Sequence, residues 1–151
     1  MSTDLIQIYI NDRPIIELLD RAIARGRDMS TPFQEIATVM QYAVEENFLQ
    51  EGRPSWVPLA EATIAERQRK HPGSTMKILQ DSERLATSIT SASDAFSAQI
   101  STDTIYAAIH NFGGPAGRGH SVTIPARPFM VLLDDDLEEV IDILERHLAG
   151  E

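Results

Sequence analysis

Residues 105–136, IYAAIHNFGGPAGRGHSVTIPARPFMVLLDDD, contain the clearest succession of structural signals in the chain. The first part of this stretch predicts a short helix. Asp103, which precedes the stretch, is a residue type that caps helices, and the helix ends at Gly113, because glycine commonly follows a helix. Three apolar residues of this helix are predicted to face inward: Ile105, Ile109 and Phe112. The glycines that follow predict a mobile loop.

Two strands and the start of a helix are predicted beyond the glycines. Val122–Ile124 and Phe129–Leu133 have the composition of strands and flank an Arg-Pro kink. Asp134–Asp136 begin the last helix, because carboxylates are favoured at the positive N-terminal end of the helix dipole. The apolar face of that helix comprises Leu137, Val140, Ile141, Leu144 and Leu148, and the acids pointing away from it are Glu138, Glu139, Asp142 and Glu145.

The N-terminal part of the chain predicts a strand followed by two long helices. Leu5–Ile10 alternates between apolar and polar residues and predicts a short strand. Pro14 opens an amphipathic helix that ends at Gly26. Thr31–Gln34 has the pattern of a capping box, with proline at the first helical position, and starts a second helix that ends at Gly52.

The middle of the chain is less regular. Ala60–Lys70 predicts a helix and Ser82–Ala86 a short helical turn. Thr87–Ile100 predicts a polar hairpin that turns at Ser91–Asp94, with Phe96 in its second strand. The order of these elements predicts an α+β fold, a small, mainly antiparallel β-sheet packed with amphipathic helices, in a single domain spanning residues 1–151.

Charge and composition exclude several function classes. The net charge of −10 argues against a nucleic-acid-binding face as the main function. Residues 134–151 hold eight acids and one arginine, so −7 of the −10 lies there. The chain has no cysteine, its N-terminus lacks the basic, apolar pattern of a secretory signal, and its longest apolar run, Phe129–Leu133, is too short for a membrane span. We expect neither specific nucleic-acid binding nor membrane association.

No catalytic, cofactor or metal residues are predicted. The glycine-rich GGPAGRGHS lacks the lysine of a phosphate-binding loop, and Pro115 removes a backbone donor. The four histidines, His71, His110, His120 and His147, lack the spacing of a zinc site. The chain has no Gly-x-Ser-x-Gly nucleophile motif. We therefore expect no cofactor and no small-molecule substrate.

Two aromatic features have alternative interpretations. Trp56, the only tryptophan, lies between two prolines and either packs its loop onto the core or contacts a partner. Arg127-Pro128-Phe129 has a composition enriched at interfaces. The alternative for this second feature is the start of a strand, with Phe129 inward and Arg127 capping a carbonyl or an acid.

Four segments, taken in order, resemble the phage virion morphogenesis, or tail completion, family. They are EGRPSWVPLAEATIAERQRK, LQDSERLATSI, YAAIHNFGG and IPARPFM, and the resemblance covers roughly residues 30–148. The matching residues are Glu51, Gly52, Pro54, Trp56, Pro58, Leu59, Thr63, Arg67, Leu85, Tyr106, Ala107, His110, Phe112, Gly113, Gly114, Pro125, Arg127, Pro128 and Phe129. The chain departs from the family at Glu83, where the family has glycine.

The resemblance implies a structural protein of a phage or prophage that completes the tail or joins it to the head. It implies a fold similar to small α+β phage tail and neck proteins, a homo-oligomeric ring at the neck, and other tail or neck proteins as partners. The location would be the host bacterial cytoplasm during assembly and then the virion. The residues implied to serve assembly or structure are Trp56, Pro58, Leu59, Thr63, Arg67, Tyr106, His110, Phe112, Gly113, Gly114, Arg127, Pro128 and Phe129.

Two other classes of protein stay open from the residues alone. One is a small phage-encoded enzyme, a nuclease or a peptidase, which requires acids or histidines gathered in a cleft. The other is a regulatory binding module. A ring-forming protein differs from both in having an oligomeric mass in solution.

Overall fold

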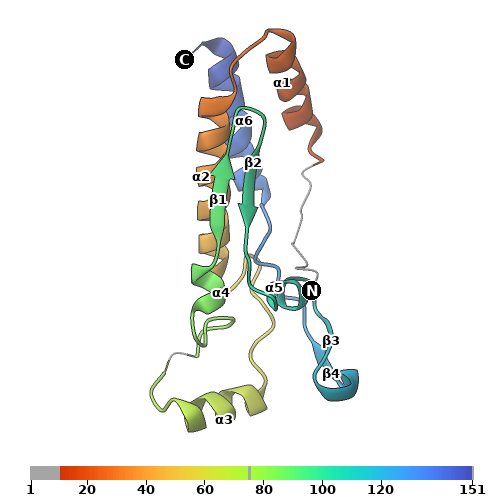
Figure 1. Ribbon diagram of the computed structural model, residues 1–151. Coiled ribbons are helices and arrows are strands. Elements are labelled where there is room, and N and C mark those ends of the chain that lie inside the picture. Colours follow the sequence, from red (N-terminus) through yellow and green to blue (C-terminus); the bar gives the residue numbers. More distant parts are fainter. Residues whose placement is uncertain (1–10, 75, 151) are drawn as a thin grey trace. The chain divides into compact units, whose positions relative to one another are not determined.

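The computed structural model describes residues 11–74 and 76–150 (Figure 1). Its helices are α1 (Arg13–Ala24), α2 (Ser30–Leu49), α3 (Glu61–Lys70), α4 (Arg84–Thr87), α5 (Ala107–Phe112) and α6 (Asp134–Ala149), with a 3-10 turn, η1 (Arg118–His120). The strands are β1 (Thr90–Ser93), β2 (Ala98–Ser101), β3 (Gly114–Ala116) and β4 (Val122–Ile124). β1 pairs with β2 and β3 with β4, both antiparallel. The predicted α+β class is confirmed. The strands of the described residues form two small sheets instead of one.

The described chain divides into two compact units that alternate along the sequence. Unit 1 contains residues 44–89 and 102–130, and unit 2 contains residues 11–43, 90–101 and 131–150. The expectation of a single domain over residues 1–151 stays a prediction. The predicted strand Leu5–Ile10 lies outside the described residues. None of the described helices has the length and apolar character that a membrane span requires.

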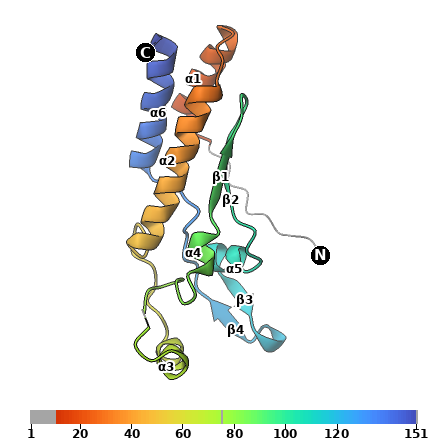
Figure 2. The same ribbon diagram turned by 60° about the vertical axis from the view of Figure 1, so that its left-hand side comes forward.

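Unit 2 is built on α1, the N-terminal part of α2, and α6, which lies alongside α2 (Figures 1 and 2). Its core contains Ile15, Leu18, Ala22, Met29, Ile36, Val39, Val140, Ile143, Leu144 and Leu148. The predicted apolar and acidic faces of α6 are confirmed, and Ile143 joins the buried face. The carboxylate of Asp12 caps α1 by accepting from the backbone N–H of Ile15 at 3.2 Å.

Two local features of unit 2, the start of α2 and the turn of the β1–β2 hairpin, do not lie where the sequence predicted them. The capping box at Thr31–Gln34 does not form, because α2 already begins at Ser30, whose N–H and hydroxyl donate to the carboxylate of Asp28. The hairpin is confirmed, but its turn lies at residues 94–97 instead of 91–94. The Asp94 carboxylate accepts from two N–H groups ahead of it, which fixes the turn there. Phe96 therefore lies in the turn and not in a strand.

Unit 1 shows why the predicted strand Phe129–Leu133 does not form. Asn111 Oδ1 accepts from the backbone N–H groups of Phe129 and Met130 at 3.0 and 2.9 Å. Asn47 Nδ2 donates to the carbonyl of Phe129 at 2.7 Å. These buried side-chain amides provide the hydrogen bonds that a neighbouring strand otherwise supplies.

The helix before the glycines also differs from its prediction. Asp103 does not cap it, because α5 begins at Ala107. Ile105 is 86% exposed and Phe112 60% exposed, whereas the buried residues are Ala107 and Asn111. The core-facing position belongs to Asn111 because its amide satisfies the backbone of residues 129 and 130.

Two shorter segments complete unit 1. The glycine segment predicted as a mobile loop is a hairpin, since Gly114–Ala116 pairs with Val122–Ile124, which confirms the second of these as a strand. The helical turn predicted at Ser82–Ala86 is α4, shifted toward the C-terminus. Glu83, where the resemblance implies a glycine, has φ of 59°, in the left-handed conformation that glycine adopts most easily.

Candidate functional site

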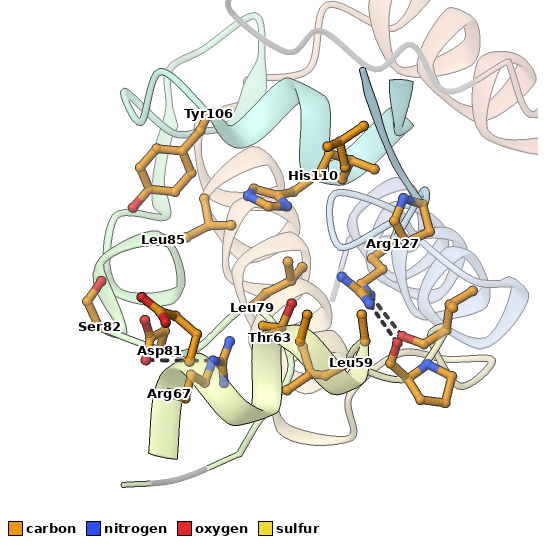
Figure 3. A pocket seen from close by; sticks show the side chains of 18 of the residues that line it. Leu59, Thr63, Arg67, Leu79, Asp81, Ser82, Leu85, Tyr106, His110 and Arg127 are labelled. Atoms are coloured by element: carbon orange, nitrogen blue, oxygen red, sulfur yellow. Dashed lines mark hydrogen bonds and ion pairs between the residues drawn. The ribbon is translucent and has the colours of Figure 1, made fainter. Parts of the chain in front are cut away.

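Unit 1 contains a groove with a cavity volume of about 940 Å³. Its walls come from four parts of the chain: the loop at residues 57–60, α3, residues 79–85, and the two ends of the segment from Tyr106 to Arg127. The side chains of Leu59, Leu79 and Leu85 line its middle in Figure 3. The groove therefore brings together residues that lie up to seventy positions apart in the sequence.

Arg127 lies at one side of the groove and holds two of its walls together. Its Nε and Nη2 donate to the carbonyls of Val57 and Pro58, both at 2.9 Å, and its backbone N–H donates to the carbonyl of His110 at 2.9 Å. The side chain is 7% exposed. Burial lowers the pKa of Arg127, and the neighbouring charge of Arg67 lowers it further.

Arg127 has no carboxylate partner within the described residues, since its hydrogen bonds go to backbone carbonyls. A buried cation without a counter-charge is costly, and an incoming anion reduces that cost. The groove can therefore favour an anionic group beside Arg127.

Arg67, on α3, is the second buried arginine of the groove. Its Nη1 donates to the carbonyl of Lys77 at 2.7 Å, and its Nε lies 3.6 Å from a carboxylate oxygen of the exposed Asp81 (Figure 3). Glu66 also borders the groove, but its carboxylate pairs with Arg69 and Lys70, each at 2.9 Å, and the hydrogen bond from Arg69 lowers the pKa of Glu66 most. Within the part of the chain that the structure describes, Arg67 is the one of the two arginines that has a nearby carboxylate.

His110, on α5, lies at the rim of the groove opposite α3 (Figure 3). Its ring packs edge-on against Tyr106, with the centroids 5.8 Å apart. Its Nδ1 is buried and has no hydrogen-bond partner among the described residues. Burial lowers the pKa of His110 below its ordinary value of 6.5, and Arg127 lowers it further, so the imidazole is neutral at pH 7.

Trp56 and Phe129 support the groove from within the core. Trp56 is 6% exposed and its Nε1 donates to the carbonyl of Pro128 at 2.9 Å. Phe48 packs against both rings, with centroid distances of 5.8 Å to Trp56 and 5.1 Å to Phe129. Trp56 thus packs its loop onto the core. Phe129 points inward and Arg127 caps backbone carbonyls, as the second interpretation of Arg127-Pro128-Phe129 predicted. The strand that this interpretation also predicted does not form.

Gly113 is required by a close approach of two backbone segments. Its φ of 72° and ψ of 176° are accessible almost only to glycine. A Cβ at this position would lie 2.7 Å from the nitrogen of Ala126 and 2.8 Å from the carbonyl oxygen of Ile124. The glycine therefore lets α5 end directly against the segment that leads to Arg127.

The residues expected to serve assembly or structure separate into three groups. Those lining the groove are Pro58, Leu59, Thr63, Arg67, Tyr106, His110 and Arg127. Those that support it through packing, backbone contact or close approach are Trp56, Pro128, Phe129 and Gly113. Gly114 is the first residue of β3, and Phe112 points to solvent.

Several residues important to the site were missed. Leu79 and Asp81 line the groove, and although they lie in one of the four segments, neither is among its matching residues. Asn47 and Asn111 hold the segment of Phe129; Asn47 had a signal, a polar residue among apolar ones on the buried side of a helix, and Asn111 had none. Among the residues that the structure describes, no three histidines, aspartates or glutamates gather as a metal site would require.

Comparisons with known proteins agree along nearly the whole chain. The phage virion morphogenesis family matches residues 10–149. Mu-like prophage FluMu G protein 2 of Haemophilus influenzae is 36% identical over 142 residues, which cover 93% of this chain and 94% of the relative. Putative capsid assembly protein G of Escherichia phage Mu is 30% identical over 157 residues, which cover 99% of this chain and 97% of the relative. No solved structure matches the chain significantly.

Proposed function

This chain belongs to the phage virion morphogenesis family, and from that membership we propose that it completes the phage tail or joins the tail to the head. In this proposal it acts as a homo-oligomeric ring at the neck and contacts other tail or neck proteins. It assembles in the cytoplasm of the bacterial host and remains in the virion. Its action is binding, not catalysis.

The observation that carries the proposal is the common location of the family's motif residues. Seven of the thirteen residues expected to serve assembly or structure line one groove. Val57 and Val122, both exposed apolar residues, also border it. An apolar groove with exposed apolar borders supports a role in contacting another protein.

A second candidate is capsid assembly, which the name of the relative from phage Mu favours. The two candidates differ in the particle that fails to form. Without a tail-completing or joining protein, DNA-filled heads and tail tubes accumulate separately. Without a capsid-assembly protein, filled heads are missing.

Electron microscopy of lysates distinguishes the two candidates when the gene is inactivated in the phage or prophage that encodes it. We expect filled heads and separate tails, and infectious particles after purified protein is added to the extract. Yield should rise in proportion to the added protein until one ring per particle is supplied, whereas an enzyme restores full yield at a small fraction of that amount. Missing heads, or restoration by such a small fraction, would contradict the proposal.

A further inference from the structure

We propose that the turn of the β1–β2 hairpin in one copy of the protein docks into the groove of unit 1 in a second copy. The inference rests on the proposed function, because it provides the contact between neighbouring subunits of the ring. The occupant is a second copy of this chain, and the two surfaces involved are an acidic, aromatic turn and a basic, apolar groove.

The turn presents Phe96 to solvent in a fixed conformation. The Asp94 Oδ1 atom accepts from the N–H groups of Phe96 and Ser97, at 2.7 and 2.8 Å, and from the Ser97 hydroxyl at 3.2 Å. The N–H of Asp94 donates to the carbonyl of Ser97 at 2.9 Å. Phe96 is nevertheless 89% exposed. A turn held by four hydrogen bonds therefore displays an unburied aromatic ring, and such prior ordering lowers the entropic cost of docking.

The turn also presents a negative charge. All the hydrogen bonds that the described residues make to the Asp94 carboxylate go to Oδ1, so Oδ2 stays available. These bonds lower the pKa of Asp94, that from the Phe96 N–H most, which keeps the carboxylate ionised. An aromatic ring and an available carboxylate oxygen thus lie two residues apart on one turn.

The groove has the complementary features. Leu59, Leu79 and Leu85 form an apolar middle, and Arg127 beside it is a buried cation that has no carboxylate partner among the described residues. The cavity of about 940 Å³ is comparable to pockets that hold drug-sized ligands. A four-residue turn can fill such a cavity, whereas a single side chain would leave part of it empty. Phe96 would pack in the apolar middle, and the Asp94 carboxylate would lie toward Arg127.

The two surfaces are different, and every copy carries one of each. Such a head-to-tail contact joins copies in series, and it closes into a ring when the rotation between neighbours divides a full turn. A self-complementary contact would stop at a dimer. The pairing of the turn with the groove is therefore the type of contact that a ring requires.

The first test uses disulfide cross-linking, for which the chain offers a background without cysteine. Ala95→Cys places a thiol in the turn beside Phe96, and Thr63→Cys places one on the exposed side of α3 at the groove. Under mild oxidation the double variant should form a ladder of covalent oligomers, and a mixture of the two single variants should form a covalent heterodimer. The control pair is Thr63→Cys with Asp20→Cys, an exposed position on α1. Equal cross-linking of this control pair would overturn the proposal.

The second test uses native mass spectrometry of two variants that each remove one side of the contact. Phe96→Ser removes the ring, and Thr63→Trp fills the groove; both positions are exposed, so circular dichroism should show an unchanged fold. Each variant should self-associate at least tenfold more weakly than wild type. An equimolar mixture should give a heterodimer and nothing larger, because it retains one intact turn and one intact groove. Oligomers of wild-type size from Phe96→Ser would overturn the docking proposal.

The outcomes separate this inference from the proposed function. A wild-type ring that restores particles and is unaffected by either substitution contradicts the docked turn and leaves the proposed function standing. A wild-type chain that is monomeric and does not cross-link contradicts both the docked turn and the ring. Loss of particle restoration by Phe96→Ser together with loss of the ring supports both.

Discussion

At the scale of single residues, the groove depends on side chains that hydrogen-bond to backbone carbonyls far away in the sequence. Trp56 donates to the carbonyl of Pro128, and Arg127 donates to the carbonyls of Val57 and Pro58. The loop before α3 is therefore attached to the segment after β4 from both directions. Loss of either donor should affect the position of the whole wall.

Trp56→Ala tests this attachment. We expect a loss of about 3–5 kcal/mol in the free energy of unfolding, because the substitution removes a large buried aromatic side chain. Trp56→Phe is the matched variant: it keeps the ring packing against Phe48 and removes the N–H donor, with an expected loss of about 1–3 kcal/mol. Urea unfolding followed by circular dichroism measures both. Equal stability of Trp56→Ala and wild type would contradict the attachment.

His110 makes the stability of the protein depend on pH. Because burial lowers its pKa below 6.5 in the folded state, the unfolded state binds more protons below about pH 6.5. Stability is therefore lost as the pH falls from the unfolded pKa through the folded one. His110→Gln should lose less stability than wild type between about pH 7.5 and 5.5.

Urea unfolding at the two pH values measures this difference, with His71→Gln as the control at an exposed position. The control should lose as much stability as wild type. An identical loss in His110→Gln and wild type would show that the imidazole does not resist protonation in the folded protein.

At the scale of elements, the sequence predicted those helices and strands that local interactions stabilise. The apolar periodicity of α1, α2 and α6 was sufficient because each buries one continuous stripe. Residues 129–133 have the composition of a strand, but their partners are the amides of Asn47 and Asn111. Such long-range side-chain bonds leave no periodic signal, so neither the loss of the strand nor the buried Asn111 could be predicted.

The junction of α5 and β3 gives a prediction at this scale. Gly113→Ala should cost about 3 kcal/mol, because the new Cβ would meet the backbone of Ala126 and Ile124 and the conformation is strained for alanine. Gly119→Ala is the matched control: its φ of 68° is also positive, but no atom of the described residues lies within 4 Å of the Cβ, so the expected cost is about 1 kcal/mol. Thermal unfolding of both variants measures the difference. Equal costs would mean that the close approach contributes nothing.

At the scale of the whole molecule, many of the residues that match the family's motifs line one groove. The resemblance includes nine residues that line the groove, because each lies in a motif. It could not predict that they share one cavity, since that depends on the path of the chain between motifs. Leu79 and Asp81, outside the motifs' matching residues, completed the groove only in three dimensions.

The concentration of acids on α6 leads to a prediction about DNA passage through the proposed ring. Exposed Glu138, Glu139 and Asp142 would repel phosphates within about 8–10 Å at physiological salt, whereas lysines there would hold DNA through counterion release. If α6 faces the lumen, replacing the three acids with lysine should leave assembly intact and slow DNA ejection. The alternative is that these acids solubilise an outer surface.

Phage complementation followed by an ejection assay measures the effect. The matched control reverses Glu17, Asp20 and Glu45, which are also exposed; in both variants each reversal adds two charges, so the net charge changes from −10 to −4. Ejection at the wild-type rate by the α6 variant would place its acids away from the DNA. Equal slowing by the control would assign the effect to total charge.

The alternation of the two units along the sequence has a consequence for synthesis of the protein. The described part of unit 1 is interrupted by the hairpin, and unit 2 lacks α6 until residues 131–150 have been made. A nascent chain on the ribosome therefore cannot bury the core of unit 2 until α6, the partner of α1 and α2, has emerged from the exit tunnel. Chains that stop early, and segments cut out by a protease, lack part of at least one unit. The supply of folded subunits is thereby tied to translation through α6, and chains that stop before it leave the apolar faces of α1 and α2 unburied.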